Sequence, residues 1–440
     1  MYNIIDYGAI GDGKTLSTVA IQAAVDACSA NGGGTVFIPA DGVFVSGSVH
    51  LHDNVHIVFE NGAVLLGSTD MNDFDPYEEI TYPKYQDRSH SYFHHSLFYA
   101  ENCNNISFGG VGKIDMQSAW EVDDSRRGAK PIALKECKDV LIADLIIRNA
   151  TDLAVYFAGC ENVRVTGLNI RAHIDGISPD SCKNVVISDC ILNVGDDAIV
   201  PKSSFTLNRF QYCENLTITN CVISSRCNAI KLGTESNAGF INVAISNCSI
   251  YNTRYSGIAL EAVDGALFDG ITVSNISMRN VGNPFLIIVL NRARGPEGTT
   301  IGKIRNVTFS NITANGPYKE WVCMPHYYDA FIQNSIVQTP MPIPAIIAGQ
   351  PDSIIENVSL SNIQITMPGG GTVEDRSIVI PEIRDGYPEG IRFGLKHPIY
   401  GMFARDVDNL KLFNVEFFTD SPDEREPILL DRVVNYKAFN

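Results

Sequence analysis

The sequence has a shortage of positive charge and of long apolar runs. Its 33 Lys and Arg stand against 50 Asp and Glu, which gives a formal net charge of −17. This acidic excess argues against nucleic acid or an anionic membrane surface as a general partner, because both are themselves anionic. The sequence contains no apolar run of about 18 residues, which excludes a transmembrane helix.

The sequence also shows no secretion signal at its N-terminus, since MYNIIDYGAIGDG has neither a basic nor an apolar segment. Its 11 Cys are an odd number and are spread along the chain without zinc-site spacing. This pattern favours reduced thiols over a disulfide framework. We therefore expect a cytoplasmic protein, or a secreted one if a leader has been trimmed, and no metal or other cofactor.

A repeated phrase runs through the chain, in which an Asn or Asp is followed by alternating apolar residues. Copies include NVRVTGLNI from Asn162, NVVISDCIL from Asn184 and NLTITNCVI from Asn215, at steps of 184 − 162 = 22 and 215 − 184 = 31 residues. The alternation predicts a strand in each copy, and successive copies are not separated by helical patterns. Such a period predicts the coils of a parallel β-helix, with the repeated Asn residues forming a hydrogen-bonded ladder.

We accordingly expect an all-β fold, a single right-handed parallel β-helix of about ten coils over residues 1–440. A helix is predicted at 17–30, where apolar residues recur at helical spacing, and it is expected to cap the N-terminal end. The cap would occupy 1–50, the catalytic coils 100–315, and further coils and loops 316–440. Irregular stretches at 70–99 and 316–351 are candidates for binding loops, and 375–397 for a segment that folds over one face.

Five cysteines occupy equivalent places in the repeats, and a buried free thiol behaves as a small apolar group. We therefore expect them to fill the core: Cys182, Cys190, Cys213, Cys221 and Cys248.

One segment near the N-terminus imitates a nucleotide-binding loop, because the residues from Gly8 to Thr15 fit the pattern GxxxxGK[ST] between a strand and a helix. The rest of the chain does not have the alternating helices and parallel strands of a nucleotide-binding fold. We interpret the segment as a turn of the N-terminal cap.

Three carboxylates carry the clearest chemical signal. Asp175 and Asp196 are 196 − 175 = 21 residues apart, one turn of the solenoid, so they should lie in neighbouring coils about 5 Å apart, and Asp197 adds a third. Crowded carboxylates have pKa values that separate, so that one donates a proton while another stays ionised, as glycoside hydrolysis requires. Carboxylates that cap a turn, and a Ca²⁺ site, are the alternatives.

The coils beside the carboxylates supply candidate substrate-binding residues: His173, Lys202, Asn228, Lys231, Glu261 and Arg292. For His173 the alternatives are sugar binding and packing at the coil edge. Arg292 would clamp a carboxylate or a leaving sugar, or be solvated. The aromatic residues at 92–99 would stack on sugar rings or pack beneath their own loop.

Two motifs resemble a known family. HIDGISPDSC from His173 and GDDAIVPKSS from Gly195 are similar to NTDGIDPDSC and GDDAIAIKS of the polygalacturonase family of glycoside hydrolases, family 28. GGVGKIDMQSAW at 109–120 resembles the family's GTIDGQGxxWW. The opening 25 or so residues resemble the N-terminal cap of the wider pectin-degrading β-helix superfamily. The resemblance covers about residues 1–290.

The resemblance implies an inverting hydrolase in which Asp196 is the general acid, while Asp175 and Asp197 hold and activate the water. It also implies a structural role for Lys202. The chain departs from the family where Asn228 replaces a histidine and Lys231 a serine. It departs again where Ala259-Leu260-Glu261 replaces the RIK that binds the uronate carboxylate. We therefore expect a neutral or rhamnose-containing sugar near the cleaved bond.

The expected function is exo-acting hydrolysis of pectin- or rhamnogalacturonan-derived oligosaccharides. A β-helix polysaccharide lyase with Lys231 as base, and a carbohydrate-binding β-helix without activity, are the alternatives. Retention of all three aspartates disfavours the second. An oligosaccharide is the expected partner, and the sequence gives no indication of the oligomeric state.

Overall fold

The structure, a computed structural model, describes all residues except 121–126, 318–320, 324–335, 339–340 and 440. Its described residues group into two compact units. The first contains Met1–Asp196 and Thr206–Arg209, and the second contains Asp197–Phe205, Phe210–Cys323 and Ile336–Asn440. The regular secondary structure of each unit is mostly β-strand, and the one α-helix among the described residues belongs to the first.

The first unit contains one α-helix, three 3₁₀ turns and nineteen short strands. Its non-strand elements are η1 Ile4–Tyr7, α1 Thr18–Ala30, η2 Met71–Asp73 and η3 Arg88–His90. Its strands are β1 Tyr2–Asn3, β2 Asp12–Leu16, β3 Gly34–Ile38, β4 Val43–Ser46, β5 Val49–His50, β6 Val55–Phe59, β7 Val64–Gly67, β8 Ser96–Glu101, β9 Asn104–Gly109, β10 Lys113–Asp115, β11 Lys130–Lys135, β12 Lys138–Ala143, β13 Ile146–Ala150, β14 Val155–Ala158, β15 Glu161–Thr166, β16 Asn169–Ala172, β17 Ile177–Asp180, β18 Lys183–Ser188 and β19 Ile191–Val194.

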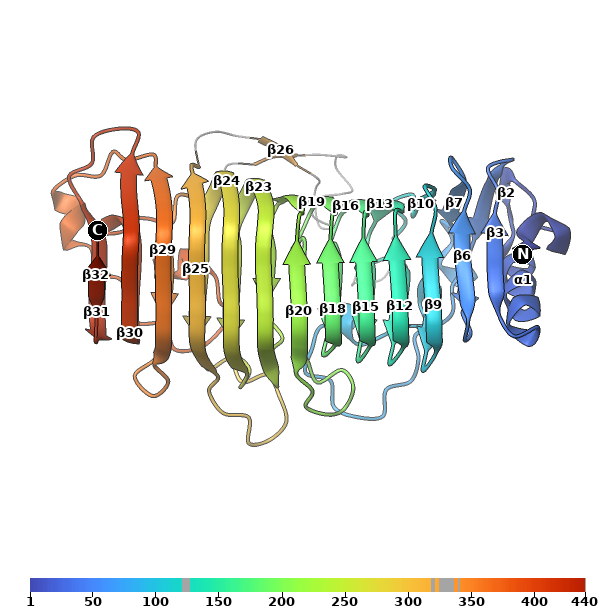
Figure 1. Cartoon of the computed structure of the whole chain (residues 1–440), viewed down its shortest axis with the longest axis horizontal. Helices are drawn as coiled ribbons and strands as arrows, with labels where there is room; N and C mark the ends of the chain where they lie inside the picture. Colours follow the sequence, from blue (N-terminus) through green and yellow to red (C-terminus); the bar gives the residue numbers. More distant parts are fainter. Residues whose placement is uncertain (121–126, 318–320, 324–335, 339–340, 440) are drawn as a thin grey trace. The chain divides into compact units, whose positions relative to one another are not determined.

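Strands of the first unit stack in parallel, each on the equivalent strand of the preceding coil. β12, β15 and β18 form one ladder, with Val140 beside Val163 and Val163 beside Val185. β13, β16 and β19 form a second parallel ladder, and β11, β14 and β17 a third. Figure 1 shows β9, β12, β15 and β18 side by side with the same direction. Three strands per turn, each paired with the next turn, are the coils of a parallel β-helix.

The second unit continues the same kind of stacking with longer strands. Its elements are β20 Cys213–Thr219, β21 Val222–Ser225, β22 Ile230–Leu232, β23 Gly239–Ala262, β24 Leu267–Val289, β25 Lys303–Asn315, β26 Trp321–Cys323, β27 Ile336–Gln338, β28 Ala345–Ala348, β29 Ile355–Met367, η4 Glu374–Ser377, η5 Gly390–Phe393, β30 Ile399–Thr419, β31 Glu426–Val434 and β32 Lys437–Phe439. β23 pairs in parallel with β24, β24 with β25, β25 with β29, and β29 with β30. These strands also lie side by side in Figure 1.

The predicted asparagine ladder is present in both units. In the first, Asn184 Nδ2 donates to Asn162 Oδ1 at 3.0 Å. In the second, Asn242 Nδ2 donates to Asn215 Oδ1 at 2.8 Å, and Asn409 Nδ2 to Asn357 Oδ1 at 2.8 Å. These residues have φ between 55° and 60°, a conformation that asparagine tolerates better than most residues. The repeat therefore encodes both a strand and the turn that precedes it.

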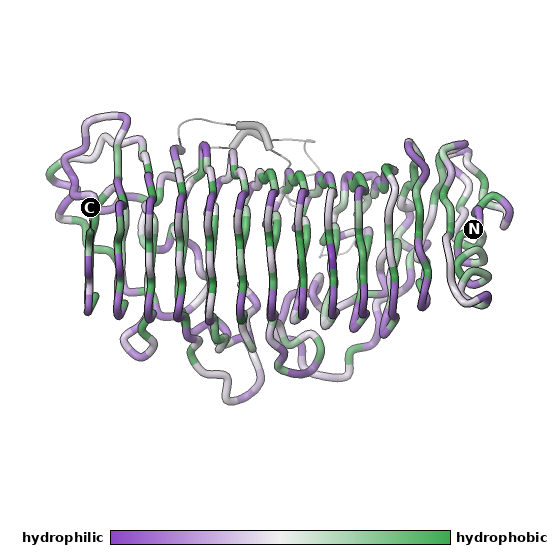
Figure 2. The backbone as a smooth tube through the Cα atoms, in the orientation of Figure 1, coloured by the Kyte–Doolittle hydropathy of each residue, from purple (hydrophilic) through white to green (hydrophobic). Residues whose placement is uncertain are grey.

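Alternating side chains fill the bore of the coils. The burial along β15 and β18 follows the predicted period of two, and Figure 2 shows polar and apolar positions alternating along the strands. The repeat cysteines fill the core as predicted, because all five are buried free thiols: Cys182, Cys190, Cys213, Cys221 and Cys248.

The predicted helix at 17–30 is α1, Thr18–Ala30, with Ser17 at its N-cap. It buries one face in the first unit, made of Ala20, Ile21, Ala24, Val25 and Cys28. The preceding segment is not a phosphate loop, because the backbone amides of Lys14 and Thr15 donate to Asp12 Oδ1 at 2.8 and 2.7 Å. Within the described part of the chain, helices fall short of the length and apolar character needed to cross a bilayer.

Candidate active site

Asp175 and Asp196 come together in the first unit, as their spacing of one turn predicts. Their carboxylate oxygens lie within 4.8 Å of each other. The Gly195 amide donates to the Ala172 carbonyl at 2.9 Å, which holds the loop of Asp196 against the coil that carries Asp175. Asp175 is 5% exposed and Asp196 is partly exposed, so one carboxyl is buried while its neighbour faces solvent. Two like charges this close disfavour ionisation of both together.

His173 lies two residues before Asp175 and is buried in the first unit. Its Nε2 is 3.0 Å from Ser118 Oγ, and its ring centroid is 5.9 Å from that of Trp120. These contacts support packing at the coil edge over direct binding of a sugar.

Asp197, the next residue after Asp196, belongs to the second unit and is 4% exposed there. It accepts hydrogen bonds from the Asn228 amide at 3.0 Å and from Asn228 Nδ2 at 2.8 Å. Asn228 Oδ1 in turn accepts from the Ser256 amide at 3.0 Å. The asparagine that stands in place of the family histidine therefore fixes Asp197 from the next coil. The backbone amide that Asp197 accepts from belongs to Asn228, 31 residues away, so this contact is not the capping of its own turn.

Lys231 supplies the positive charge beside Asp197. Its Nζ forms an ion pair with Asp197 Oδ2, and both side chains are almost completely buried. The two opposite charges are in direct contact and lie away from solvent, so each is balanced by the other. Asp197 is thus fixed by an amide, a carboxamide and an ammonium.

Lys202 is bound to groups of the protein in the second unit. Its Nζ is 2.8 Å from Glu235 Oε2 and 3.2 Å from the Gly233 carbonyl, and it is buried. The ion pair closes a turn of the second unit.

Glu261 lies in the same unit, 2% exposed, at the end of β23. Its Oε2 accepts from Thr234 Oγ1 at 3.2 Å. Burial raises the pKa of Glu261 to about 7; the charge of Asp197 acts in the same direction, while Lys231 opposes it. The side chain therefore changes its protonation state near neutral pH.

Arg292 is buried and paired with an acid, rather than solvated. Its Nε donates to Asp264 Oδ1 at 2.9 Å, and its Nη2 forms an ion pair with Asp264 Oδ2. The other terminal nitrogen, Nη1, is buried without a hydrogen-bond partner in the structure.

The segment 385–389 contributes two residues that the sequence analysis did not single out. The Tyr387 hydroxyl lies 3.4 Å from Lys231 Nζ and 3.1 Å from Thr234 Oγ1. Burial raises the pKa of Glu389, and both Lys231 and Arg254 oppose that rise. The expectation that 375–397 folds over a face of the protein is thus met in the second unit. The sequence signal that could have found them is a tyrosine and a glutamate in a segment rich in glycine and proline, Gly386-Tyr387-Pro388-Glu389-Gly390.

The aromatic residues of the 70–99 loop pack on one another in the first unit. The ring centroids of Tyr77 and His95 are 4.5 Å apart and those of His94 and Tyr99 are 4.7 Å apart, both stacked. Tyr92 contacts Tyr77 edge-on. This supports packing beneath the loop over a sugar-stacking surface. The 316–351 loop includes 318–320, 324–335 and 339–340, which lie outside the described residues.

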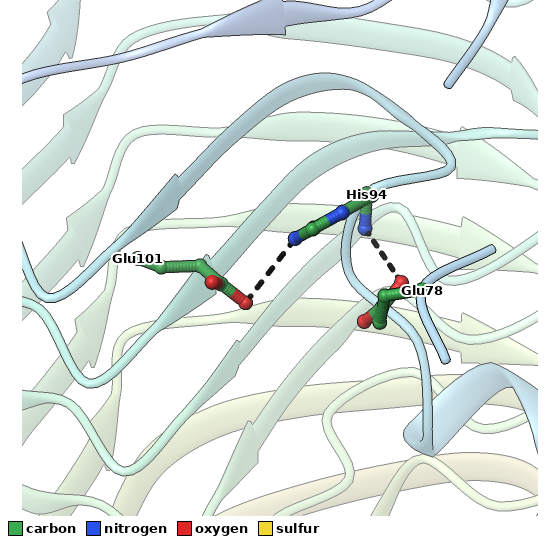
Figure 3. Close-up of side chains that lie close together, drawn as sticks. All are labelled: Glu78, His94 and Glu101. Atoms are coloured by element: carbon green, nitrogen blue, oxygen red, sulfur yellow. Dashed lines mark hydrogen bonds and ion pairs between the residues drawn. The ribbon is translucent and has the colours of Figure 1, made fainter. Parts of the chain in front are cut away.

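Among the residues that the structure describes, two groups of side chains have a geometry that can hold a metal ion. One contains the Asp175 and Asp196 pair, and the other contains Glu78, His94 and Glu101 of the first unit (Figure 3). In the second group His94 Nε2 faces Glu101 Oε1 at 3.4 Å, and the His94 amide donates to Glu78 Oε2 at 3.2 Å. Lys135 Nζ lies 3.2 Å from the same Glu101 oxygen, so an ammonium already balances that carboxylate.

Parallel coils that carry crowded aspartates place the protein in the class of β-helix proteins with a cluster of acids on one coil edge. The family model for glycosyl hydrolases family 28 matches residues 28–324, a span that contains Asp175, Asp196, Asp197, Lys202 and Lys231. The chain belongs to glycosyl hydrolase family 28.

The relatives agree with this assignment. A probable polygalacturonase of Vitis vinifera is 29% identical over 278 residues, 59% of this chain and 56% of its own length. An exo-poly-alpha-D-galacturonosidase of Dickeya chrysanthemi is 25% identical over 82% of this chain and 71% of its own length. The chain thus spans little more than half of the Vitis relative.

The solved structures show the same fold. The family 28 exopolygalacturonase of Yersinia enterocolitica superposes with a TM-score of 0.72 at 20% identity, covering 99% of this chain and 78% of that one. The exopolygalacturonase of Thermotoga maritima gives a TM-score of 0.64 at 20% identity, covering 83% of this chain and 86% of that one.

Proposed function

We propose that the protein is an exo-acting glycoside hydrolase that inverts the anomeric carbon of pectin- or rhamnogalacturonan-derived oligosaccharides. The single observation that carries hydrolysis in this proposal is the Asp175 and Asp196 pair, whose carboxylate oxygens lie within 4.8 Å of each other. Inversion rests on the resemblance to family 28. One protonated and one ionised carboxyl at such a place are what acid/base cleavage of a glycoside requires. Membership of family 28 and the exo-acting names of two relatives support the substrate class and the exo mode.

Asp196 is the general acid in this proposal, since it is the more exposed of the pair and can reach a leaving oxygen. Asp175 and Asp197 hold and deprotonate the water. Asp197 suits this task because Lys231 pairs with its carboxylate and Asn228 fixes its orientation. The chain needs no cofactor for these steps.

The finer features of the fold belong to the same proposal. In this proposal the coils are right-handed and number about ten, and α1 caps the N-terminal end. The length of the repeat supports this arrangement. The buried face of α1 and its exposed opposite side fit a capping role.

The proposal is tested by mass spectrometry of pectic oligosaccharides after incubation with the wild type and with Asp196→Asn. Products that carry one added water, and that fall by about 10²–10⁴-fold with Asp196→Asn, are expected for loss of a general acid. Sequential release of single sugars is the mark of exo action. Unsaturated products would instead identify a lyase and overturn the proposal.

A further inference from the structure

Tyr387 is an aromatic side chain held beside the charged residues of the second unit but still open to solvent. It is 48% exposed, whereas Lys231 and Thr234, which contact its hydroxyl, are almost completely buried. A tyrosine that is anchored at its hydroxyl and about half exposed has the form of a residue that packs against a sugar.

Arg292 lies next to this ring and offers a hydrogen-bond donor. Its guanidinium carbon is 5.9 Å from the centre of the Tyr387 ring, and its side chain is 8% exposed. Nη1 is buried without a hydrogen-bond partner, although the other end of the guanidinium is satisfied by Asp264. A buried donor without a partner is costly, and a sugar oxygen placed beside the Tyr387 ring would satisfy it.

The charges around the ring favour an uncharged sugar. Lys231 is already paired with Asp197, and Arg292 with Asp264, so each of these cations is balanced by an acid of the protein. Glu261 adds a carboxyl whose Oε2 lies 3.2 Å from Thr234 Oγ1, and Thr234 contacts Tyr387. When Glu261 is ionised, a second carboxylate in the same place would meet like-charge repulsion.

We propose that Tyr387, Arg292 and Glu261 form a subsite for an uncharged sugar ring, with the ring of Tyr387 against the sugar and Arg292 Nη1 donating to a sugar oxygen. Glu261 excludes uronates from this subsite. The inference rests on the proposed glycoside hydrolase function and specifies the kind of sugar ring that the second unit binds.

The test is isothermal titration calorimetry at pH 8, where Glu261 is largely ionised, with the Asp196→Asn variant of the full chain. The two probes are digalacturonic acid and a rhamnogalacturonan disaccharide with rhamnose at its non-reducing end. The rhamnose probe is expected to bind at least about tenfold more tightly, since like-charge contact opposes the other. Glu261→Gln in the same background should reduce this preference.

Tyr387→Ala should weaken binding of the rhamnose probe roughly tenfold, because the stacking contact is lost, while Tyr387→Phe keeps the ring and most of the affinity. Tyr251→Ala is the matched control, because Tyr251 is also exposed on the second unit and lies outside the proposed subsite. Thermal unfolding of each variant verifies that it is folded.

The outcomes separate this inference from the proposed function. Equal or tighter binding of digalacturonic acid, or no effect of Tyr387→Ala, would overturn the subsite even if the wild type hydrolyses the probes. Tyr387-dependent binding of the rhamnose probe without any hydrolysis by the wild type would support the subsite and overturn the proposed function. Binding of neither probe would overturn the subsite.

Discussion

Lys231 forms a buried ion pair with Asp197 in the second unit, at a place where the family pattern has a serine. The same ammonium lies 3.4 Å from the Tyr387 hydroxyl and influences both Glu261 and Glu389. The same lysine thus pairs with a proposed catalytic carboxylate and opposes the rise in pKa of two neighbouring acids. The replacement of serine by lysine is therefore a change of electrostatics at the site and not a neutral substitution.

Replacement of Lys231 by methionine should reduce activity and stability together. The buried Asp197 carboxylate would lose its cation, and breaking a buried ion pair from one side costs about 3–5 kcal/mol. Urea denaturation measures the loss of stability, and kcat/KM on the hydrolysed oligosaccharide measures the loss of activity. Lys303→Met is the matched control, because Lys303 forms a half-exposed pair with Glu356 on the same unit. An equal effect of both substitutions would contradict the role given to Lys231.

Glu261 should make the stability of the protein fall as pH rises through neutrality. Its pKa is about 7 in the folded state against 4.5 for an ordinary glutamate, so the folded state binds the proton more tightly. The stabilisation is complete below pH 4.5 and is lost as pH rises to about 7, a change on the order of 3 kcal/mol.

Urea denaturation of the wild type and of Glu261→Gln between pH 4.5 and 8 measures this contribution. Glutamine keeps the shape and cannot ionise, so the difference in unfolding free energy between the two proteins should vary with pH in this range. A difference that is independent of pH would show that Glu261 has an ordinary pKa.

The stereochemical course of hydrolysis should be inversion if the roles given to the three aspartates are right. Proton NMR of the first-formed product distinguishes the two anomers before mutarotation. Inverting enzymes commonly hold their carboxyl groups about 6.5–9.5 Å apart and retaining enzymes about 5–5.5 Å apart. The Asp175 and Asp196 oxygens lie within 4.8 Å of each other. If the product retains the anomeric configuration, one of these two aspartates is a nucleophile and the roles given above are wrong.

Chelation should leave the activity unchanged. The proposed steps use only carboxyl groups, a water and the ion pair of Lys231 with Asp197. Activity is measured before and after dialysis against EDTA, with added Ca²⁺ and Zn²⁺ as the reverse experiment. Loss of activity that Ca²⁺ restores would favour a metal at the Asp175 and Asp196 pair, and restoration by Zn²⁺ that Glu78→Gln abolishes would favour the group of Glu78, His94 and Glu101.

Much of the fold could be predicted because the same short sequence pattern recurs many times along the chain. Each copy pairs alternating apolar residues with an asparagine that tolerates a left-handed turn, and copies such as those from Asn162 and Asn184 became adjacent strands joined by their side chains. The spacing of one turn also brought Asp175 and Asp196 together. A periodic pattern of this kind can be recognised from neighbouring residues alone, without knowing which distant segments come into contact.

The partners of the site residues could not be predicted in the same way. Tyr387 reaches Lys231 across 156 residues of sequence, and Arg292 pairs with Asp264. Such contacts depend on where an irregular segment folds back and on which charges become buried together. The sequence by itself determined the strand repeat, the asparagine ladder and the crowding of two aspartates. Only the tertiary structure decided which acidic and basic side chains pair with each other, because burial and long-range pairing arise once distant segments are packed.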